Sequence, residues 1–231
     1  MKRDIKHITV FTGAGVSAES GLDTFRGAGG LWEGYRVEEV ATPEAWAQNP
    51  ELVQRFYNVR RKACRAAQPN AAHKALVELE RYYEVDIITQ NIDDLHERAG
   101  SSRILHLHGE IVKAQSSINP NLVYPIEGEE LRMGEKCALG SQLRPHVVWF
   151  GEAVPNMEKA FEIVRETDLL VVIGTSLKVY PAALLVYEVG VGADIVVIDP
   201  NALENKMPGQ VRYIAENATR GVQILLQELA K

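Results

Sequence analysis

Cysteine and long hydrophobic runs are both scarce in this sequence. Its 231 residues include only two cysteines, Cys64 and Cys137, which argues against a disulfide framework and favours a reducing compartment. The longest apolar runs have the length of strands, so no membrane-spanning helix is expected. The first residues, Met-Lys-Arg-Asp, lead into a predicted strand and not into a signal peptide. We therefore expect a cytoplasmic protein with no membrane partner.

Positive charge is also in short supply. The chain has 25 Lys and Arg against 31 Asp and Glu, a formal net charge of -6. A protein that binds nucleic acid regardless of sequence needs a basic surface, and the short cluster Arg60-Arg61-Lys62 does not provide one. We expect no nucleic-acid partner. The composition, 46% hydrophobic and 24% charged, is typical of one α/β domain that buries a sizeable core.

Glycine is concentrated where the first predicted strand ends. Residues 5–12 are apolar and β-branched, as in a buried strand, and Gly13-Ala-Gly15 follows before a predicted helix. The spacing of Gly13, Gly15 and Ala18 fits the dinucleotide-binding pattern in its Gly/Ala form. In that pattern Gly13 permits a tight turn, and Gly15 lets backbone N–H groups approach a pyrophosphate at the positive end of the helix. The alternative is a strand-to-helix turn whose small residues serve packing alone.

The next segment departs from an ordinary dinucleotide-binding unit. Such a unit has a second strand and an acidic ribose ligand about 20 residues further on. Here residues 25–32 form a glycine-rich loop that carries Arg26 and two aromatic side chains, Phe25 and Trp32, and no strand is predicted before Val85. This argues against an ordinary oxidoreductase and predicts a loop that folds over a ligand.

Strands and helices alternate through the rest of the chain. The predicted strands are 84–89, 103–107, 168–173, 193–198 and 211–214, and residues 145–152 are predicted to form a short strand and a turn. The alternation predicts a doubly wound, mostly parallel sheet of the Rossmann-like α/β class. We expect one domain, 1–231, whose core comprises about 1–35, 84–109 and 145–231. A helical module of about 36–83 and an irregular module of about 110–144 interrupt this core.

Polar or glycine-containing segments follow five of the predicted strands, and in parallel sheets ligands bind beyond these carboxyl ends. The segments are Gly13–Gly15, Gln90–Asp93, His108, Gly174–Ser176 and Asp199–Asn201. We expect them to converge on one site. Simpler interpretations stay open: Asp93 could only cap a helix, and Gly174-Thr-Ser could be only a turn. His106 and His108 share one face of a strand and could form a metal pair.

Five motifs together make the chain resemble the sirtuins, which are NAD-dependent protein lysine deacylases. They are Gly13-Ala-Gly-Val-Ser-Ala-Glu-Ser-Gly-Leu22 with Phe25-Arg26-Gly27, Thr89-Gln-Asn-Ile-Asp93, Leu107-His108-Gly109, Val148-Trp-Phe-Gly-Glu152 and Gly174-Thr-Ser-Leu177. The resemblance covers nearly the whole length, and it is strongest to the bacterial members of the desuccinylase-type (class III) branch.

The resemblance implies that NAD binds between the doubly wound core and the inserted module. The implied cofactor-binding residues are Gly13, Ala14, Gly15, Ser17 and Ala18 near the pyrophosphate, Phe25, Arg26 and Trp32 in the covering loop, Gln90, Asn91, Ile92 and Asp93 at the nicotinamide riboside, and Gly174, Thr175, Ser176, Asn201 and Ala218 at the adenosine. It also implies His108 and Asn91 as catalytic residues. A histidine that titrates near neutrality suits the removal of a proton from a ribose hydroxyl, and the products would be nicotinamide, free lysine and O-acyl-ADP-ribose.

A preference for carboxylated acyl groups is implied by a second set of residues. Tyr57 and Arg60 lie three residues apart on a predicted helix, so they share one face. From spacing alone, Tyr57 could be core, and Arg60-Arg61-Lys62 could be a solvated basic face. The resemblance instead places both residues, with the small Ala41, around a succinyl, malonyl or glutaryl chain, with deacetylation also possible. It further implies that Val148, Phe150, Gly151 and Glu152 pair with the substrate peptide as an added strand.

The zinc cysteines of most sirtuins are missing here. The corresponding module contains only Cys137, while Ser116 or Ser117 stands at a cysteine position and Ala138-Leu-Gly-Ser141 lacks the partner cysteine. One thiolate cannot form a tetrahedral structural site, so we expect neither zinc nor another metal. The module must then be held by packing, for which the candidates are Leu122, Val123, Tyr124, Leu131 and Leu139.

Three other functions are alternatives to deacylation. One is a non-catalytic module that binds NAD or ADP-ribose, a second is an NAD-dependent oxidoreductase, and a third is a protein ADP-ribosyltransferase that uses the same site.

Overall fold

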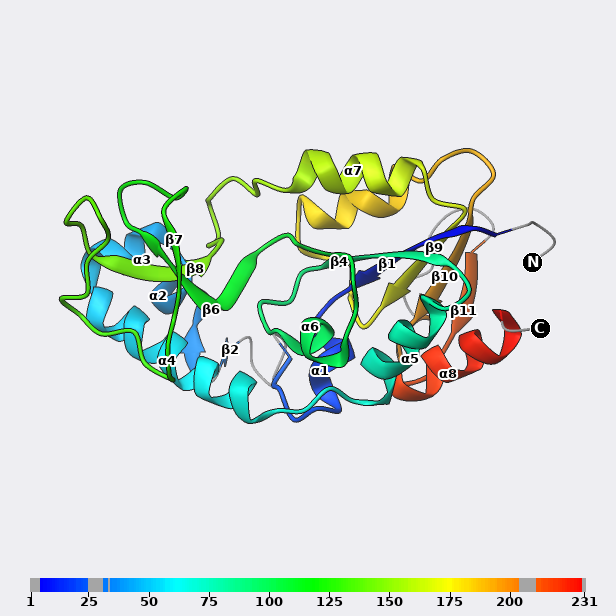
Figure 1. The fold of residues 1–231 in the computed structure, drawn as a ribbon, viewed down its shortest axis with the longest axis horizontal. Coiled ribbons are helices and arrows are strands. Elements are labelled where there is room, and N and C mark those ends of the chain that lie inside the picture. The colour runs from blue at the N-terminus through cyan, green and yellow to red at the C-terminus, as the bar shows by residue number, and fades with distance from the viewer. Residues whose placement is uncertain (1–4, 25–30, 33, 204–210, 230–231) are drawn as a thin grey trace.

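The two larger sheets of the described residues lie one at each end of the long axis of the molecule (Figure 1). The computed structural model describes residues 5–24, 31–32, 34–203 and 211–229. A six-stranded sheet forms the larger end, and a three-stranded sheet with helices packed on it forms the smaller end. Among the described residues, no helix combines the length and the apolar character needed to cross a membrane.

The six-stranded sheet is parallel throughout, and all six of its strands are predicted from the sequence. Its strands are β1 (His7–Thr12), β4 (Glu84–Thr89), β5 (Ile104–His106), β9 (Leu169–Ile173), β10 (Asp194–Ile198) and β11 (Val211–Ile214). Their spatial order is β11-β10-β9-β1-β4-β5. The chain therefore winds outward in both directions from β1, as in dinucleotide-binding folds, with the topological switch point between β1 and β9. The predicted Rossmann-like class is confirmed.

Both faces of this sheet are covered, which explains the unbroken apolar strand sequences. In β9, Leu169 and Val171 face one hydrophobic cluster, while Leu170 and Val172 face the other. Helices α5 (Ala71–Leu79) and α8 (Ala218–Leu229) cover the first face. Helix α7 (Met157–Arg165) and the 3₁₀ helix η1 (Ala182–Tyr187) cover the second.

Helix α5 corrects one boundary expected from the sequence. It lies within the range 36–83 assigned to the inserted helical module, but it packs against α8 and the six-stranded sheet. We therefore propose that the module ends near Ala67, after α4. The amphipathic pattern of α5 could not indicate which apolar surface this helix would cover.

The remaining helical module consists of α2 (Val37–Val40), α3 (Pro43–Gln48) and α4 (Pro50–Ala66). Two of these helices begin where the sequence places a capping residue before proline. Thr42 Oγ1 accepts from Ala45 N (3.0 Å), and Asn49 Oδ1 accepts from Leu52 N (3.1 Å). Proline suits the first helical position because its missing N–H would have no partner there.

The sequence predicts that the segment 110–144 is irregular, but the structure shows strands in it. Strands β6 (Gly109–Ser116), β7 (Val123–Pro125) and β8 (Leu143–Val147) form an antiparallel sheet in the order β7-β6-β8. Its own cluster contains Ala114, Ile126, Leu131, Cys137 and Leu143, with Leu122 and Tyr124 packed against it. Val123 and Leu139 are exposed, so they do not hold the module as expected. The bulge between Gly109 and Ala114 breaks the alternation that would have signalled a strand.

Short elements complete the described fold. They are helix α1 (Gly15–Ala18), the strand pair β2 (Leu31–Trp32) and β3 (Tyr35–Arg36), and helix α6 (Leu95–Ala99).

Candidate active site

One cavity of about 860 Å³ is lined by residues of both parts of the molecule. It lies beyond the carboxyl ends of β1, β4, β9 and β10 and reaches α4 and the segment after β8. The expected cofactor-binding and catalytic residues that line it are Gly13, Ala14, Gly15, Ser17, Ala18, Gln90, Asn91, Ile92, Asp93, His108, Gly174, Thr175, Ser176, Asn201 and Ala218. The expected substrate-binding residues that line it are Ala41, Tyr57, Arg60, Val148, Phe150, Gly151 and Glu152. Phe25 and Arg26 lie outside the described residues, and Trp32 belongs to β2.

Glycines bring two strand-to-helix turns into backbone contact at the switch point. A Cβ on Gly15 would lie 2.6 Å from Gly174 Cα, and one on Gly13 would lie 2.7 Å from Thr175 Cβ. Gly15 N donates to Gly174 O (2.9 Å), and Gly174 has a positive φ of 60°. The lack of side chains at these positions therefore serves close packing of the turns after β1 and β9, in addition to the ligand approach that the motif predicts.

The loop of residues 90–93 joins the ends of three neighbouring strands. Gln90 Nε2 donates to Thr175 Oγ1 after β9 (2.9 Å), and Asn91 Nδ2 donates to Ser17 Oγ in α1 (3.1 Å). Ser17 Oγ in turn donates to Asp93 Oδ2 (3.0 Å), and Asp93 Oδ1 accepts from Leu95 N (3.1 Å) at the start of α6. Asp93 thus supports the following helix, as the simpler interpretation holds, and also lines the cavity. Its burial raises the pKa of this carboxyl.

A buried polar chain holds the same loop from beneath. Asn91 N donates to Thr89 Oγ1 (3.0 Å), which also accepts from Thr12 Oγ1 (2.8 Å). Thr12 has therefore used its only proton, and His96 Nε2, at 3.1 Å, must donate to Thr12 Oγ1. Burial holds the pKa of His96 well below its usual value, which fits a neutral ring that donates through Nε2.

His108 has the protonation pattern of a general base. Its Nδ1 lies 3.0 Å from Gln90 O, and because a carbonyl only accepts, Nδ1 carries the proton. A neutral His108 therefore keeps a lone pair on Nε2. Burial lowers the pKa of His108, and the bond to Gln90 opposes that shift only in part. The ring is consequently neutral near pH 7 and can accept a proton.

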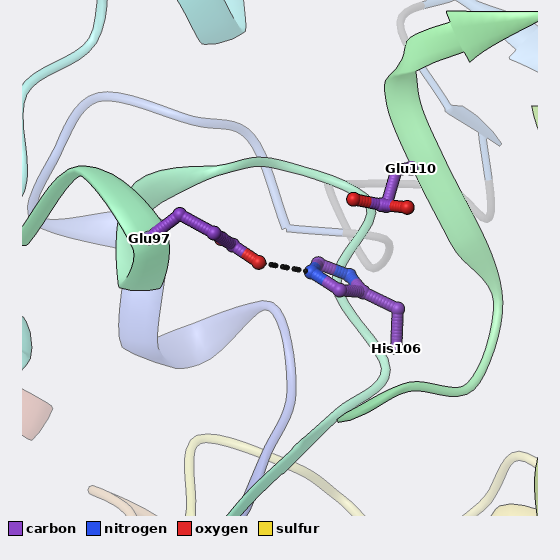
Figure 2. Close-up of side chains that lie close together, drawn as sticks. All are labelled: Glu97, His106 and Glu110. Atoms are coloured by element: carbon purple, nitrogen blue, oxygen red, sulfur yellow. Dashed lines mark hydrogen bonds and ion pairs between the residues drawn. The ribbon is translucent and has the colours of Figure 1, made fainter. Parts of the chain in front are cut away.

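The other strand-end histidine has different partners. His106 Nδ1 lies 3.0 Å from Asn91 O, and its Nε2 lies 2.7 Å from Glu97 Oε1. Sequence spacing suggested a metal pair of His106 and His108. In the structure, the side chain of His106 instead lies beside those of Glu97 and Glu110 (Figure 2). No sequence pattern indicates these two glutamates, because they come from different elements, α6 and β6.

The far end of the cavity contains a tyrosine and an arginine from one face of α4. Tyr57 is fully buried and its hydroxyl accepts from Trp149 Nε1 (3.1 Å). Burial raises the pKa of Tyr57 far above its usual value. Arg60 is only 9% exposed, so the alternative of a solvated basic face is wrong for it. It is also wrong for Arg61, whose Nε donates to Ile111 O (2.7 Å).

The segment Val148–Glu152 is a turn whose polar groups are already engaged. Phe150 N donates to Ala41 O (3.0 Å), and Val148 N donates to His108 O (2.9 Å). The carboxylate of Glu152 accepts from Trp149 N (2.8 Å) and from both terminal nitrogens of Arg144 (2.8 and 2.9 Å). The side chain of Glu152 therefore orders this turn, and the expected strand pairing with a peptide remains a prediction.

Several lining residues were not anticipated from the sequence. Trp149 packs beneath the guanidinium of Arg144, whose carbon lies 3.7 Å from the ring centroid. The cavity also contacts Cys64 and the segment Leu177–Pro181 after β9. Leu177 has a positive φ of 54°, a conformation that a leucine in a sequence does not signal.

Comparisons with known proteins agree with this geometry. Residues 13–181 match the model of the Sir2 family. The chain is 52% identical over 225 residues to an NAD-dependent protein deacylase of Helicobacter pylori, covering 97% of this chain and 96% of the relative. It is 50% identical over 230 residues to an NAD-dependent protein deacylase of Bacteroides thetaiotaomicron, covering 97% and 98%.

Solved structures show the same relationship. A Sir2 homolog–NAD complex superposes with a TM-score of 0.87 at 39% identity, covering 98% of this chain and 90% of that one. A Sir2–p53 peptide–NAD⁺ complex gives a TM-score of 0.76 at 26% identity, covering 98% and 95%. The family match, the relatives and the shared fold agree with the five sequence motifs, and the chain therefore belongs to the Sir2 family, the sirtuins.

Proposed function

We propose that this protein is an NAD-dependent protein lysine deacylase. Its relatives from Helicobacter pylori and Bacteroides thetaiotaomicron carry that name. The observation that carries the proposal is the state of His108, a part-buried, neutral imidazole that lines the cavity and has its lone pair on Nε2. A purely binding module would have no need of such a base.

The residues present fit NAD. The cavity of about 860 Å³ is within the size range of small-molecule and cofactor sites, and the glycine turns after β1 and β9 lie at the switch point where dinucleotides bind. Gly13, Gly15, Ser17 and the loop 90–93 would hold the cofactor at one end, and Asn201 and Ala218 at the other. When bound, NAD would supply a ribose carbon that receives the acyl oxygen as nicotinamide departs, and the addition of one water would then give free lysine and O-acyl-ADP-ribose.

Within that reaction, His108 takes up a proton at Nε2 from a ribose hydroxyl. Nδ1 keeps its proton and goes on donating it to Gln90 O, and this hydrogen bond stabilises the imidazolium that forms. A positioned base of this kind contributes roughly 10²–10⁴-fold to the rate. We assign Asn91 a catalytic role beside His108. Hydrogen bonds to Thr89 and Ser17 hold the backbone N–H and the side chain of Asn91 in place.

We further propose a preference for acyl groups that end in a carboxylate. Tyr57 and Arg60 line the cavity together with Ala41, which is buried and leaves room beside them. A guanidinium binds a carboxylate through a charge-assisted hydrogen bond worth about 1.5–3 kcal/mol. Succinyl, malonyl and glutaryl chains offer that carboxylate, whereas an acetyl group does not. Deacetylation by the same site then proceeds without this contribution.

We propose that the module formed by residues 110–144 folds without zinc. Cys137 Sγ lies 3.1 Å from Ser141 Oγ, which is 2.9 Å from Ser116 Oγ. A tetrahedral zinc site would need further thiolate ligands beside Cys137, but the neighbouring side chains are serine hydroxyls. The cluster around Leu131 and Ile126 supplies the packing.

Both cysteines are free, which supports a reducing, cytoplasmic location.

The products of the reaction test the proposed activity. Incubation with NAD and a succinyl-lysine peptide should release nicotinamide only when the peptide is present, with loss of the acyl mass from the peptide in mass spectrometry. His108→Asn keeps a donor for Gln90 O but has no base, so kcat should fall about 10²–10⁴-fold. The absence of any product would favour a binding module, a mass gain on protein would favour ADP-ribosyl transfer, and a reduced cofactor would favour an oxidoreductase.

Replacement of Arg60 tests the acyl preference. In Arg60→Met, kcat/KM for a succinyl-lysine peptide should fall about 10- to 100-fold, because the charge-assisted bond is lost. The value for an acetyl-lysine peptide should change little, and Arg60→Lys should retain part of the succinyl preference. Equal losses on both peptides, or none on either, would contradict the assignment.

Elemental analysis tests the zinc-free module. Purified protein should contain far less than one zinc per chain, and its thermal unfolding should not change on treatment with EDTA. A structural zinc would contribute an apparent binding energy of about 10–16 kcal/mol, so its removal would be obvious. Stoichiometric zinc that is lost in Cys137→Ser would refute the proposal.

A further inference from the structure

His106 bridges helix α6 and the loop of residues 90–93, which is called the cofactor loop from here on. Its Nδ1 lies 3.0 Å from the carbonyl oxygen of Asn91, and its Nε2 lies 2.7 Å from a carboxylate oxygen of Glu97 (Figure 2). A carbonyl and a carboxylate both accept and cannot donate. Both contacts can therefore form at once only when both ring nitrogens carry a proton, that is, when His106 is an imidazolium.

The surroundings favour that charge. Glu110 on β6 brings a second carboxylate, and one side-chain nitrogen or oxygen atom of each of Glu97, His106 and Glu110 lies within 4.8 Å of the other two. Lys113 pairs with Glu110 (2.5 Å), so the charges in this group are balanced by cations of the chain itself. The other titratable groups that act electrostatically on His106 or are acted on by it are Asp93, His96 and His146.

The electrostatics of the ring agree with its contacts. The side chain of His106 is 9% exposed, and burial by itself would lower its pKa. The contacts with Glu97 and with Asn91 O outweigh burial and raise the pKa of His106 above its usual value. Its neighbour His108 has a single acceptor and a lowered pKa. Two histidines that are two residues apart therefore differ in charge.

From these contacts we infer that His106 is a positioning residue, whose charged ring fixes the Asn91 carbonyl and thereby sets the cofactor loop. The inference rests on the proposed function, because it assigns this loop to NAD. The N–H of Asn91 is held by Thr89 and its C=O by His106, so the backbone of this residue is fixed on both sides of its Cα. Its side chain then points at Ser17, and His106 itself need not touch the reactants.

Deprotonation of His106 would release the loop. A neutral ring has one proton for two acceptors, and the charged Glu97 competes for it better than the neutral carbonyl does. The Asn91 contact is then lost. The loop is held below the raised pKa of His106 and loosens as the pH rises through it, so KM for NAD should increase on the alkaline side. His108, which keeps its own bond to Gln90, should leave kcat much less affected.

Two substitutions at position 106 separate positioning from a general structural role. Asparagine places its amide nitrogen near the position of Nδ1 and can still donate to Asn91 O, whereas glutamine reaches toward the position of Nε2. In His106→Gln, KM for NAD should rise about tenfold with kcat within about twofold, and His106→Asn should recover most of that loss. Equal effects of both variants, or an unchanged KM, would overturn the inference.

Replacement of Glu97 provides the matched pH experiment. In Glu97→Gln, the amide can donate to a neutral Nε2, which leaves the remaining ring proton on Nδ1 for Asn91 O. KM for NAD should therefore stay low and lose its alkaline rise. A rise that persists in this variant would show that another group titrates.

A measurement on the wild-type chain does not depend on turnover. Nitrogen NMR of the histidine rings should show His106 protonated on both nitrogens near pH 7, with a titration midpoint above its usual value. A neutral ring at that pH would overturn the inference even if every variant misfolds. If the wild-type protein shows no deacylation, the proposed function fails, while this titration and calorimetric binding of NAD to the variants still decide the role of His106.

Discussion

The hydrogen bond between His108 Nδ1 and the carbonyl of Gln90 is the contact on which the site depends. It fixes the tautomer and leaves the lone pair of a neutral imidazole on Nε2. It also gives the imidazolium a fixed partner when a proton arrives. A histidine of the same burial without this acceptor could carry its proton on either nitrogen, and only the tautomer protonated on Nδ1 could act as the base at Nε2.

That bond exists because the fold keeps the loop 90–93 in place. The loop follows β4, and its side chains contact the turn after β9 through Thr175 and helix α1 through Ser17. The glycines of the switch point let those turns approach within van der Waals contact of one another. The inserted module closes the other side of the cavity with Tyr57 and Arg60. The catalytic geometry is thus a consequence of parallel strands that end at one edge.

Much of this arrangement could be predicted from the sequence, and the limits have physical causes. Apolar runs broken by glycine or polar turns located all six parallel strands, and strand polarity brought the loop, His108 and Gly174 to one edge. Strand β6 was missed because a bulge disrupts its alternation, and β7 because it has only three residues. Part of β8 was expected as a short strand. The packing of α5 on the larger sheet was missed because an amphipathic pattern does not name its partner.

Side-chain pairings between distant segments formed the other gap. Arg144 with Glu152, and Glu97 with His106, are contacts that depend on the assembled tertiary structure. Arg60 and Arg61 were expected by one interpretation on a solvated face, yet the module encloses both. The glycine pattern after β1 was recognised, but its packing against Gly174 follows from the order of the strands and not from the motif.

The tautomer of His108 is the most direct test of this account. Nitrogen NMR of the ring at neutral pH, on protein without substrate, should show Nδ1 protonated and Nε2 unprotonated. Binding of NAD should not reverse that pattern, because Gln90 O remains the partner of Nδ1. A spectrum with the proton on Nε2, or with both nitrogens protonated, would contradict the account.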